Sequence, residues 1–345
     1  MRNVLVIDNN EIRKKKETIK MAKVKNFKTI FPAVSVPLND DYSINESEFR
    51  AYLRWIKTFY GKGMDGLVCN GHTGEITGLT RAERKRVVEI CAEECGDVMT
   101  IISGVNCENT AESIEMAKEA KEAGADGILL MPPHMWLRFG MNPDAPFEYV
   151  KDVAEGADID IIIHLYPATS KAFYPVETLI KMCKEIDHVK CIKMGTRVTS
   201  IYEHDVRLLR QECQDISLIT CHDETLCVSW FPGMDGALIG FAGCVPEIIC
   251  PAREVFANPD KHTLKEAQDW SDRIYHISQA IYGGGQPSGE AHARLKEALK
   301  QRGIFSSALM RKPVLPLNQE EKDWVALGLE RSQLPEVDMA QFEDK

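Results

Sequence analysis

The sequence predicts an α/β protein, a (β/α)8 TIM barrel with additional C-terminal helices. Short apolar runs alternate eight times with longer amphipathic segments between residues 29 and 240, which is typical of a parallel sheet whose strands are joined by helices. Eight such units favour a closed barrel. The chain has 345 residues, which is long enough for this barrel and for a helical region after it.

The predicted strands are the short apolar runs at residues 30–36, 66–69, 99–103, 127–131, 159–166, 189–194, 217–221 and 236–240. The predicted helices lie between them, near residues 46–62, 80–95, 109–123, 145–156, 175–186, 198–212 and 224–231. Start signals support several of these helices. Thr80 with Glu83, and Asn109 with Glu112, have the spacing of a capping box, and Pro175 suits a first helical turn.

The chain is expected to divide into three parts. Residues 1–26 are polar and charged, and we expect a flexible N-terminal extension there. Residues 27–244 would form the (β/α)8 barrel. Residues 245–345 would form a C-terminal helical region packed on the barrel, with the glycines at 283–285 interrupting its helices.

Composition narrows the class of protein. The net charge of −10 argues against a nucleic-acid partner. No apolar run approaches the roughly 18 residues of a membrane span, so we expect no membrane partner. The 11 cysteines lie in apolar segments without a Cys-x-x-Cys pair, a pattern that indicates reduced thiols in a cytoplasmic protein.

Lys193 is the residue around which a function can be argued. In a strand over 189–194, Lys193 shares a face with Val189 and Cys191. An ammonium among apolar neighbours is desolvated, which lowers its pKa and makes a nucleophilic amine available near neutral pH. One interpretation is therefore a Schiff-base lysine. The other is a lysine that ends a strand and extends into water.

Polar residues end two more strands. After the second strand come Gly71, His72, Thr73 and Gly74, a turn whose backbone N–H groups and hydroxyl can meet a carboxylate, although a plain strand-to-helix turn is an equal alternative. In the fifth predicted strand, His164 and Tyr166 share one face. A singly wound barrel places that strand beside Lys193, where a phenol can transfer protons.

The order of these motifs resembles the dihydrodipicolinate synthase / N-acetylneuraminate lyase family, class I aldolase-like barrels that form a Schiff base with a 2-keto acid. The resemblance spans about residues 28–305 and rests on residues 71–75, 79–80, 104, 123–127, 132, 166–167 and 192–193. It implies that Lys193 is the Schiff-base lysine and that Thr73 takes the second hydroxyl position of the family's Thr-Thr-Gly-Glu turn. It also implies a homotetramer, a dimer of dimers.

The chain departs from the family pattern at the proton-transfer positions. The family's Tyr-Asn-x-Pro is replaced by residues 164–167. Alignment on the proline gives the tyrosine position to His164, whereas alignment on ring chemistry gives it to Tyr166. We take Tyr166 as the acid/base group and His164 as its neighbour. His72 replaces the first threonine of the turn, and Pro133-His134 replaces a Tyr-Tyr pair.

Further departures concern the substrate. The arginine that binds a second carboxylate in the dihydrodipicolinate branch is absent from residues 168–171, which disfavours lysine synthesis. The chain looks more like the hydratase-aldolases that cleave arylidene-pyruvates at Trp136, Lys171 and residues 222–224. Trp136 is equally suited to contacting an aromatic substrate and to filling an oligomer interface. The candidate substrate-binding residues are Gly71, His72, Gly74, His134, Trp136, Lys171, His222, Asp223 and Gly240. The other histidines, at 188, 204, 262, 276 and 292, are expected at the surface.

The sequence thus favours a carbon–carbon lyase or aldolase, or a hydratase-aldolase, that forms a lysine Schiff base with pyruvate or a substituted 2-keto acid. Its expected catalytic residues are Lys193, Tyr166, Thr73 and His164, its partners a small 2-keto acid and an aldehyde, and it needs no cofactor because the imine through Lys193 is the electrophile. The alternatives are a metal-dependent lyase or hydrolase on the same barrel, a dihydrodipicolinate-synthase-type condensing enzyme, and a non-catalytic ligand-binding family member. The imidazoles lack a tight metal-ligand spacing, so we expect no metal.

Overall fold

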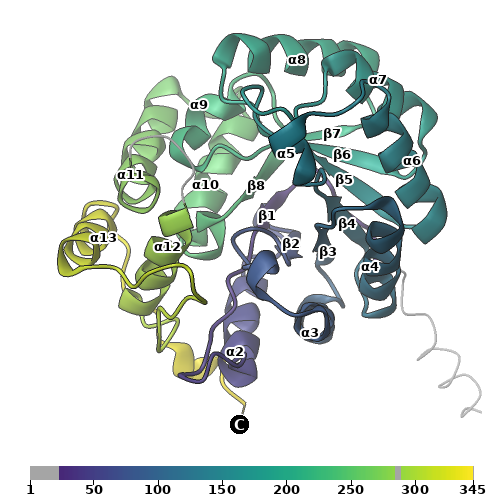
Figure 1. Ribbon diagram of the computed structural model, residues 1–345. Coiled ribbons are helices and arrows are strands. Elements are labelled where there is room, and N and C mark those ends of the chain that lie inside the picture. Colours follow the sequence, from purple (N-terminus) through teal and green to yellow (C-terminus); the bar gives the residue numbers. More distant parts are fainter. Residues whose placement is uncertain (1–22, 284–288, 345) are drawn as a thin grey trace, which may run out of the picture.

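The barrel predicted from the sequence is present in the computed structural model, which describes residues 23–283 and 289–344. Within these residues, eight parallel strands form one sheet in the order β1-β8-β7-β6-β5-β4-β3-β2 (Figure 1). A parallel bridge between Ala33 and Val68 joins the ends of this order and closes the barrel. The strands are β1 (Ile30–Pro32), β2 (Gly66–Cys69), β3 (Thr100–Val105), β4 (Gly127–Leu130), β5 (Asp160–His164), β6 (Val189–Met194), β7 (Ser217–Thr220) and β8 (Gly236–Ile239).

Helices alternate with the strands and cover the outside of the barrel. They are α2 (Glu46–Lys57), α3 (Arg81–Cys95), α4 (Thr110–Glu122), α6 (Ala145–Ala157), α7 (Val176–Glu185), α8 (Thr199–Glu212) and α9 (Leu226–Trp230). The expected start signals are confirmed at α3 and α4. Thr80 forms a full capping box with Glu83, and the Asn109 side chain accepts a hydrogen bond from the Glu112 N–H. Both satisfy N–H groups that have no partner inside the helix.

The first and fifth predicted strands were too long, and one helix was missed. Strand β1 ends at Pro32 and not at residue 36. Strand β5 ends at His164 and not at Tyr166, because Pro167 has no N–H to extend the ladder and restricts the residue before it. The short helix α5 (Met135–Phe139) was missed. The barrel is also contacted before residue 27, because Lys23 donates to the Met99 carbonyl at 2.8 Å. The rest of the predicted extension, residues 1–22, lies outside the described residues.

The C-terminal helices pack on one side of the barrel (Figure 1). They are α10 (Pro246–Ala257), α11 (Leu264–Tyr282), α12 (Gly289–Gln301) and α13 (Gln319–Arg331). Helix α11 contacts α10, α12 and α13. Two ion pairs hold this region in place. Within the region, Arg302, after α12, binds Glu247 of α10 at 2.7 Å. A buried pair attaches the region to the barrel, because Lys296 of α12 binds Glu75, which follows β2.

The interior of the protein is apolar and contains the cysteines. All 11 cysteines are free, and all except Cys183 are buried. Burial raises the pKa of several of these thiols, Cys191 and Cys221 among them, which keeps them in the unreactive thiol form. No helix in the part of the chain that the structure describes is both long and apolar enough to cross a membrane.

Candidate active site

Lys193 lies near the end of β6, beside His164 of β5. The two residues are register partners in the parallel ladder, and the Lys193 side chain is only partly exposed. The pKa of Lys193 is lowered, chiefly because burial disfavours the ammonium; Cys221 and Asp223 oppose this change and Arg197 adds to it. Among the described residues, no carboxylate forms an ion pair with Lys193. Its amine is therefore held in a site that favours the neutral, nucleophilic form.

Three imidazoles and a phenol gather beside this amine at the carboxyl ends of β2, β4 and β5. The ring of His72 lies 5.6 Å from that of His164 and 5.9 Å from that of His134. The ring of Tyr166 lies 4.9 Å from that of His164. His72 and His134, which the sequence placed after two other strands, thus join His164 and Tyr166 of the fifth predicted strand in one cluster.

Hydrogen bonds between these side chains indicate which group donates and which accepts. The Asn106 amide lies 3.1 Å from His134 Nε2, and the Tyr166 hydroxyl lies 2.9 Å from the same nitrogen. With the amide and the phenol donating, His134 Nε2 is an acceptor. The Tyr166 oxygen, 3.3 Å from His72 Nε2, can then accept a proton from His72. The phenol therefore stands in a chain along which protons can move.

Burial keeps two of these imidazoles, His72 and His164, neutral. The pKa of His72 is lowered to about 3, first by burial and then by the charge of Lys193. The pKa of His164 is lowered well below its usual value for the same two reasons, and its Nδ1 has no hydrogen-bond partner among the described residues. Burial also raises the pKa of Tyr166. At neutral pH the amine thus faces uncharged rings.

The turn after β2, which carries His72 of this cluster, also contacts the residue that follows β8. A Cβ built on Gly240 would lie 3.0 Å from Thr73 Oγ1 and 2.7 Å from the Tyr282 hydroxyl. Only glycine leaves room there. Among the described residues, the N–H groups of Thr73 and Gly74 donate to no acceptor. They remain available for an anion.

Asp223 supports this side of the site. Its Oδ1 accepts from the Gly240 N–H and from the Tyr282 hydroxyl, both at 2.7 Å. Burial raises the pKa of Asp223 to about 6, although the Tyr282 hydroxyl acts against this rise. Asp223 therefore positions the backbone of Gly240 beside Thr73.

Three predicted substrate-binding residues lie away from the imidazole cluster. Trp136 is 9% exposed and packs edge-on against Tyr149 and Tyr174. Lys171 is exposed and donates to the Arg138 carbonyl at 3.1 Å. His222 packs against Tyr202, with ring centroids 4.7 Å apart. Helix α5 determines the orientation of Trp136, and the loop after β7 determines that of His222. The spacing of residues in the sequence predicts neither orientation.

Sequence reasoning also missed residues that lie near Lys193. Asn106 directly follows β3, so its place at a strand end was a usable signal. His292 was expected at the surface, but on α12 it is only partly exposed, and desolvation together with Lys193 lowers its pKa to about 4. Arg197 lies four positions after Lys193 and forms an ion pair with Glu224. Nothing local in the sequence predicts where these last two side chains lie.

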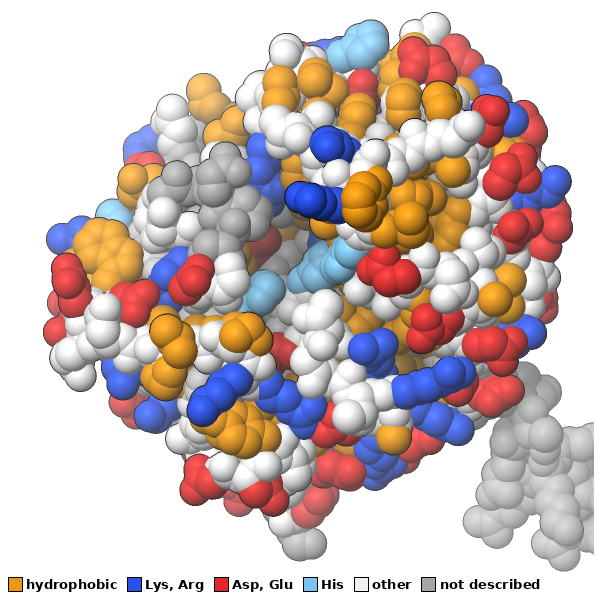
Figure 2. All heavy atoms as spheres, in the orientation of Figure 1, with side chains coloured by type: hydrophobic (Ala, Val, Ile, Leu, Met, Phe, Trp, Pro, Cys, Tyr) orange, Lys and Arg blue, Asp and Glu red, His pale blue; other side chains and the backbone are white. Residues whose placement is uncertain are grey.

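A hollow of about 460 Å³ leads to the site from the side of the C-terminal region. His72 and His292 line it, together with Glu75 and Arg311. Figure 2 shows imidazoles inside the hollow, with basic and apolar side chains on its rim. Within the described residues, no group of three or more His, Cys, Asp or Glu side chains has metal-binding geometry. The volume suits a small organic substrate.

The model of the dihydrodipicolinate synthetase family matches residues 26–331 of this sequence. The chain belongs to this family. The match includes helix α13, and so extends beyond the region expected from the sequence motifs. Membership makes the chain an enzyme, a lyase of the aldolase type.

Relatives of this family cover most of the chain at low identity. The 4-hydroxy-tetrahydrodipicolinate synthase of Bartonella bacilliformis is 26% identical over 88% of this chain and 97% of its own. That of Helicobacter pylori strain P12 is 26% identical over 84% and 92%. A DapA-like lyase of Thermofilum pendens is 25% identical over the same shares.

Solved structures of the family share the fold. Dihydrodipicolinate synthase from Aquifex aeolicus superposes with a TM-score of 0.79 at 19% identity, over 90% of this chain and all of that one. YagE of E. coli K12, solved in complex with pyruvate, superposes with the same TM-score at 20% identity, over 89% and 99%. The chain thus shares the fold of these two structures over nearly their whole length.

Proposed function

We propose that this enzyme is a carbon–carbon lyase or aldolase that forms a Schiff base between Lys193 and pyruvate or a substituted 2-keto acid. One observation carries the proposal. The Lys193 amine has a lowered pKa, has no carboxylate partner among the described residues, and lies beside His164 at the mouth of the barrel. That combination gives a lysine that attacks ketones.

The proposed reaction balances through the imine. The amine adds to the ketone and water leaves, which gives an iminium at Lys193. In the cleavage direction, the bond between the carbon next to the iminium and the carbinol carbon breaks. Its electron pair forms an enamine, and the carbinol proton goes to the protein while the aldehyde departs. Protonation of the enamine and addition of water then release the keto acid and the free amine.

The proton steps fall to Tyr166 in this proposal. Its hydroxyl is bonded to His134 Nε2 and lies 3.3 Å from His72 Nε2, so a proton that it accepts can be passed on. His164 stands closest to the amine along the strand ladder and gives it an uncharged neighbour. Thr73, with the N–H groups of Thr73 and Gly74, would hold the keto-acid carboxylate.

Reductive trapping tests this proposal directly. Purified enzyme with pyruvate and borohydride should gain one reduced pyruvyl group on Lys193, located by peptide mass spectrometry. Lys190 is the matched control, because it lies on the same strand but is exposed. The Lys190→Ala variant should be trapped like the natural enzyme. If no 2-keto acid is trapped, or if label appears equally on exposed lysines, the Schiff-base proposal fails.

A second assay identifies the substrate. We propose to measure release of pyruvate from aliphatic, sugar-derived and aromatic 2-keto acids, and the largest kcat/KM names the aldehyde partner. The names of the relatives make condensation to 4-hydroxy-tetrahydrodipicolinate the second candidate. Formation of that product, with slow cleavage of every keto acid in the panel, would favour it.

A further inference from the structure

The loop after β3, residues 106–109, holds His134 from two sides. Its first residue, Asn106, places the amide Nδ2 3.1 Å from Nε2 of the His134 ring. Two residues later, the Glu108 carboxylate accepts a hydrogen bond at 2.8 Å from the Met135 N–H, which fixes the backbone next to His134. The place of this imidazole is therefore determined by a loop that carries none of the residues given a catalytic role above.

Two donors face the same nitrogen of His134. The Asn106 Nδ2 atom carries hydrogens and can only donate, and the Tyr166 hydroxyl lies 2.9 Å from Nε2. A neutral imidazole carries one proton, and the hydrogen bond made by one ring nitrogen decides where that proton lies. Since Nε2 accepts from the amide, the proton of His134 is on Nδ1. The Tyr166 hydroxyl can then only donate to His134.

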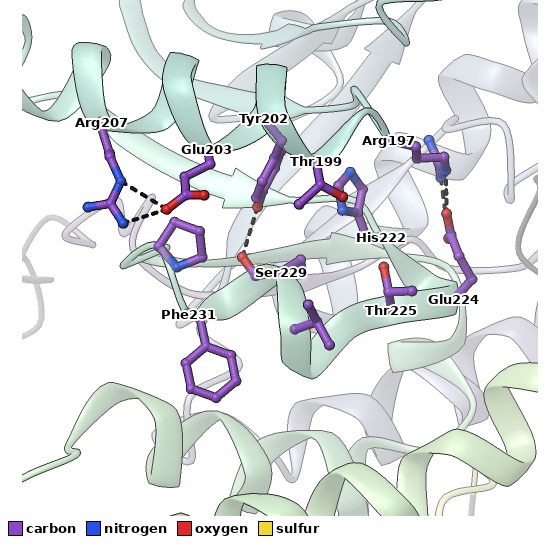
Figure 3. Close-up of a pocket in the computed structure, with 12 residues that line it drawn as sticks. Arg197, Thr199, Tyr202, Glu203, Arg207, His222, Glu224, Thr225, Ser229 and Phe231 are labelled. Carbon is purple, nitrogen blue, oxygen red and sulfur yellow. Dashed lines mark hydrogen bonds and ion pairs between the residues drawn. The ribbon is translucent and has the colours of Figure 1, made fainter.

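Two buried imidazoles elsewhere in the barrel are held differently. Within the part of the chain that the structure describes, His164 Nδ1 and His222 Nε2 have no hydrogen-bond partner. Figure 3 shows His222 beside Tyr202, and the two ring centroids lie 4.7 Å apart. Packing fixes the place of this ring but leaves its Nε2 free to donate or to accept. The contacts of His134, in contrast, fix the state of one nitrogen as well as the place of the ring.

This nitrogen matters because Tyr166 needs a proton acceptor. When the Tyr166 oxygen takes the carbinol proton, the proton it already carries must leave at the same time. His72 is one neighbour, with Nε2 at 3.3 Å, but burial lowers the pKa of His72 to about 3, which makes it a poor acceptor. His134 Nε2 is closer, at 2.9 Å, and carries no proton in this arrangement. The geometry thus favours His134 over His72 as the acceptor.

We propose that Asn106 is a positioning residue that keeps His134 Nε2 unprotonated, so that His134 takes the Tyr166 proton while the carbon–carbon bond breaks. The carbinol proton goes to the Tyr166 oxygen, the Tyr166 proton goes to Nε2, and the Nδ1 proton stays. The iminium becomes a neutral enamine as His134 becomes an imidazolium, so the net charge is unchanged. Tyr166 then protonates the enamine, and His134 returns its proton to Tyr166. These steps rest on the proposed function, whereas the resting state of the His134 ring does not.

Replacing the Asn106 amide by a carboxylate tests the role of Asn106. In Asn106→Asp the new side chain has nearly the same shape but only accepts, so it draws a proton onto Nε2 and Tyr166 loses its acceptor. We expect kcat for keto-acid cleavage to fall at least about tenfold with a smaller change in KM. The acidic limb of the kcat profile should move to higher pH, because a carboxylate stabilises the imidazolium. Asn106→Ala removes the donor without adding an acceptor, so its kcat should fall less.

Asn109→Asp is the matched control for the added charge. Asn109 lies in the same loop and caps α4 by accepting from the Glu112 N–H, a role that aspartate fills equally well. This variant should keep the kcat and the pH profile of the natural enzyme. A purely structural role for Asn106 predicts the opposite order of its two variants, with Asn106→Ala worse than the nearly isosteric Asn106→Asp.

Nitrogen NMR of the full-length enzyme with isotopically labelled histidine observes the ring directly, and His134→Gln assigns its signal. Nε2 should be unprotonated in the natural enzyme and protonated in Asn106→Asp. A protonated Nε2 in the natural enzyme, a kcat of Asn106→Asp at or above that of Asn106→Ala, or an equal loss in Asn109→Asp would overturn the proposal. Pyruvate should still be trapped at Lys193 in every variant. If the natural enzyme traps no keto acid, the proposed function fails and the proton-acceptor role of His134 fails with it, while the NMR signal still decides whether Asn106 positions the ring.

Discussion

Two lysines near the barrel mouth show what burial alone does and does not achieve. Lys193 on β6 and Lys296 on α12 both have a lowered pKa, with desolvation as the largest cause. Lys296 is 1% exposed, binds Glu75, and donates to the Leu309 carbonyl at 2.9 Å. Lys193 is partly exposed at the mouth and has no such partner among the described residues. A carboxylate converts a buried amine into a structural cation, whereas its absence leaves a nucleophile.

The pair at Lys296 has a structural task beside the active site. Glu75 has a left-handed backbone, with φ of 56°, a conformation that non-glycine residues adopt only when neighbours enforce it. Lys296 supplies that constraint from the C-terminal region, and Glu75 ends the turn that carries Thr73. In the proposed mechanism the two lysines therefore serve one site in different ways: Lys193 reacts, and Lys296 holds the turn that carries Thr73.

Replacing Lys193 should give the largest effect on activity. Lys193→Met removes the nucleophile, so we expect kcat for keto-acid cleavage to fall by roughly 10⁴-fold or more. The free energy of unfolding should stay equal or rise, because a thioether replaces a desolvated amine. Steady-state assays and urea unfolding measure both. Activity in the Lys193→Met variant would contradict the proposed difference between the two lysines, because neither would then be a nucleophile.

Replacing Lys296 should reverse this pattern. Lys296→Met leaves the Glu75 carboxylate buried without its cation, so the free energy of unfolding should fall by about 3 kcal/mol. Borohydride trapping at Lys193 should persist in the folded fraction. The double variant Glu75→Gln/Lys296→Met removes both charges and should recover part of the loss, as a urea-unfolding cycle would show. Equal stability of all four proteins would mean that the pair contributes nothing.

The difference between the two lysines also marks the limit of sequence reasoning. The barrel followed from alternating hydrophobic patterns, and Lys193 from a polar residue at the end of an apolar strand. Lys296 and His292 lie in an α12 sequence that reads as an ordinary amphipathic helix. Their placement depends on how α12 packs against the turn at Glu75, a contact between distant parts of the chain. The orientations of Trp136 and His222 could not be predicted for a related reason, because a short helix and a loop determine where they point.

Replacing Tyr166 tests whether the activity of Lys193 also depends on its uncharged neighbours, and not only on the lack of a carboxylate partner. Tyr166→Phe removes the hydroxyl bonded to His134, so kcat should fall by about 10²-fold or more. Trapping of pyruvate at Lys193 should remain, because the amine itself is unchanged. Tyr60→Phe is the control, since Tyr60 is an exposed tyrosine in the turn that follows α2. If Tyr166→Phe retains full kcat while His164→Asn loses it, the proton-transfer role belongs to His164.

Replacing Gly240 perturbs the wall that Lys296 helps to hold. A Cβ at Gly240 would press on Tyr282 and Thr73, so Gly240→Ala should displace the turn and raise KM for the keto acid by about tenfold, with a smaller change in kcat. In Gly78→Ala, the nearest atom to the new Cβ lies 3.8 Å away, so its KM should match the natural enzyme. An unchanged KM in Gly240→Ala would remove the turn from the carboxylate site.

The smallest expected effect concerns the pH dependence of stability around Lys193. The pKa of His72 is about 3 in the folded enzyme against an ordinary 6.5. As the pH falls from 6.5 towards 3, the His72 side chain binds a proton in the unfolded chain but not in the native state. The free energy of unfolding therefore decreases. Asp223, with its pKa raised to about 6 from 3.8, acts in the opposite direction between those values.

His72→Gln should therefore flatten the loss of stability between pH 7 and pH 5, as measured by urea unfolding. The exposed His204 is the control, and His204→Gln should leave the slope close to that of the natural enzyme. A slope that His72→Gln does not change would mean that His72 is charged in the native state. The amine of Lys193 would then face a cation instead of a neutral ring, and its reactivity would owe more to repulsion than to burial.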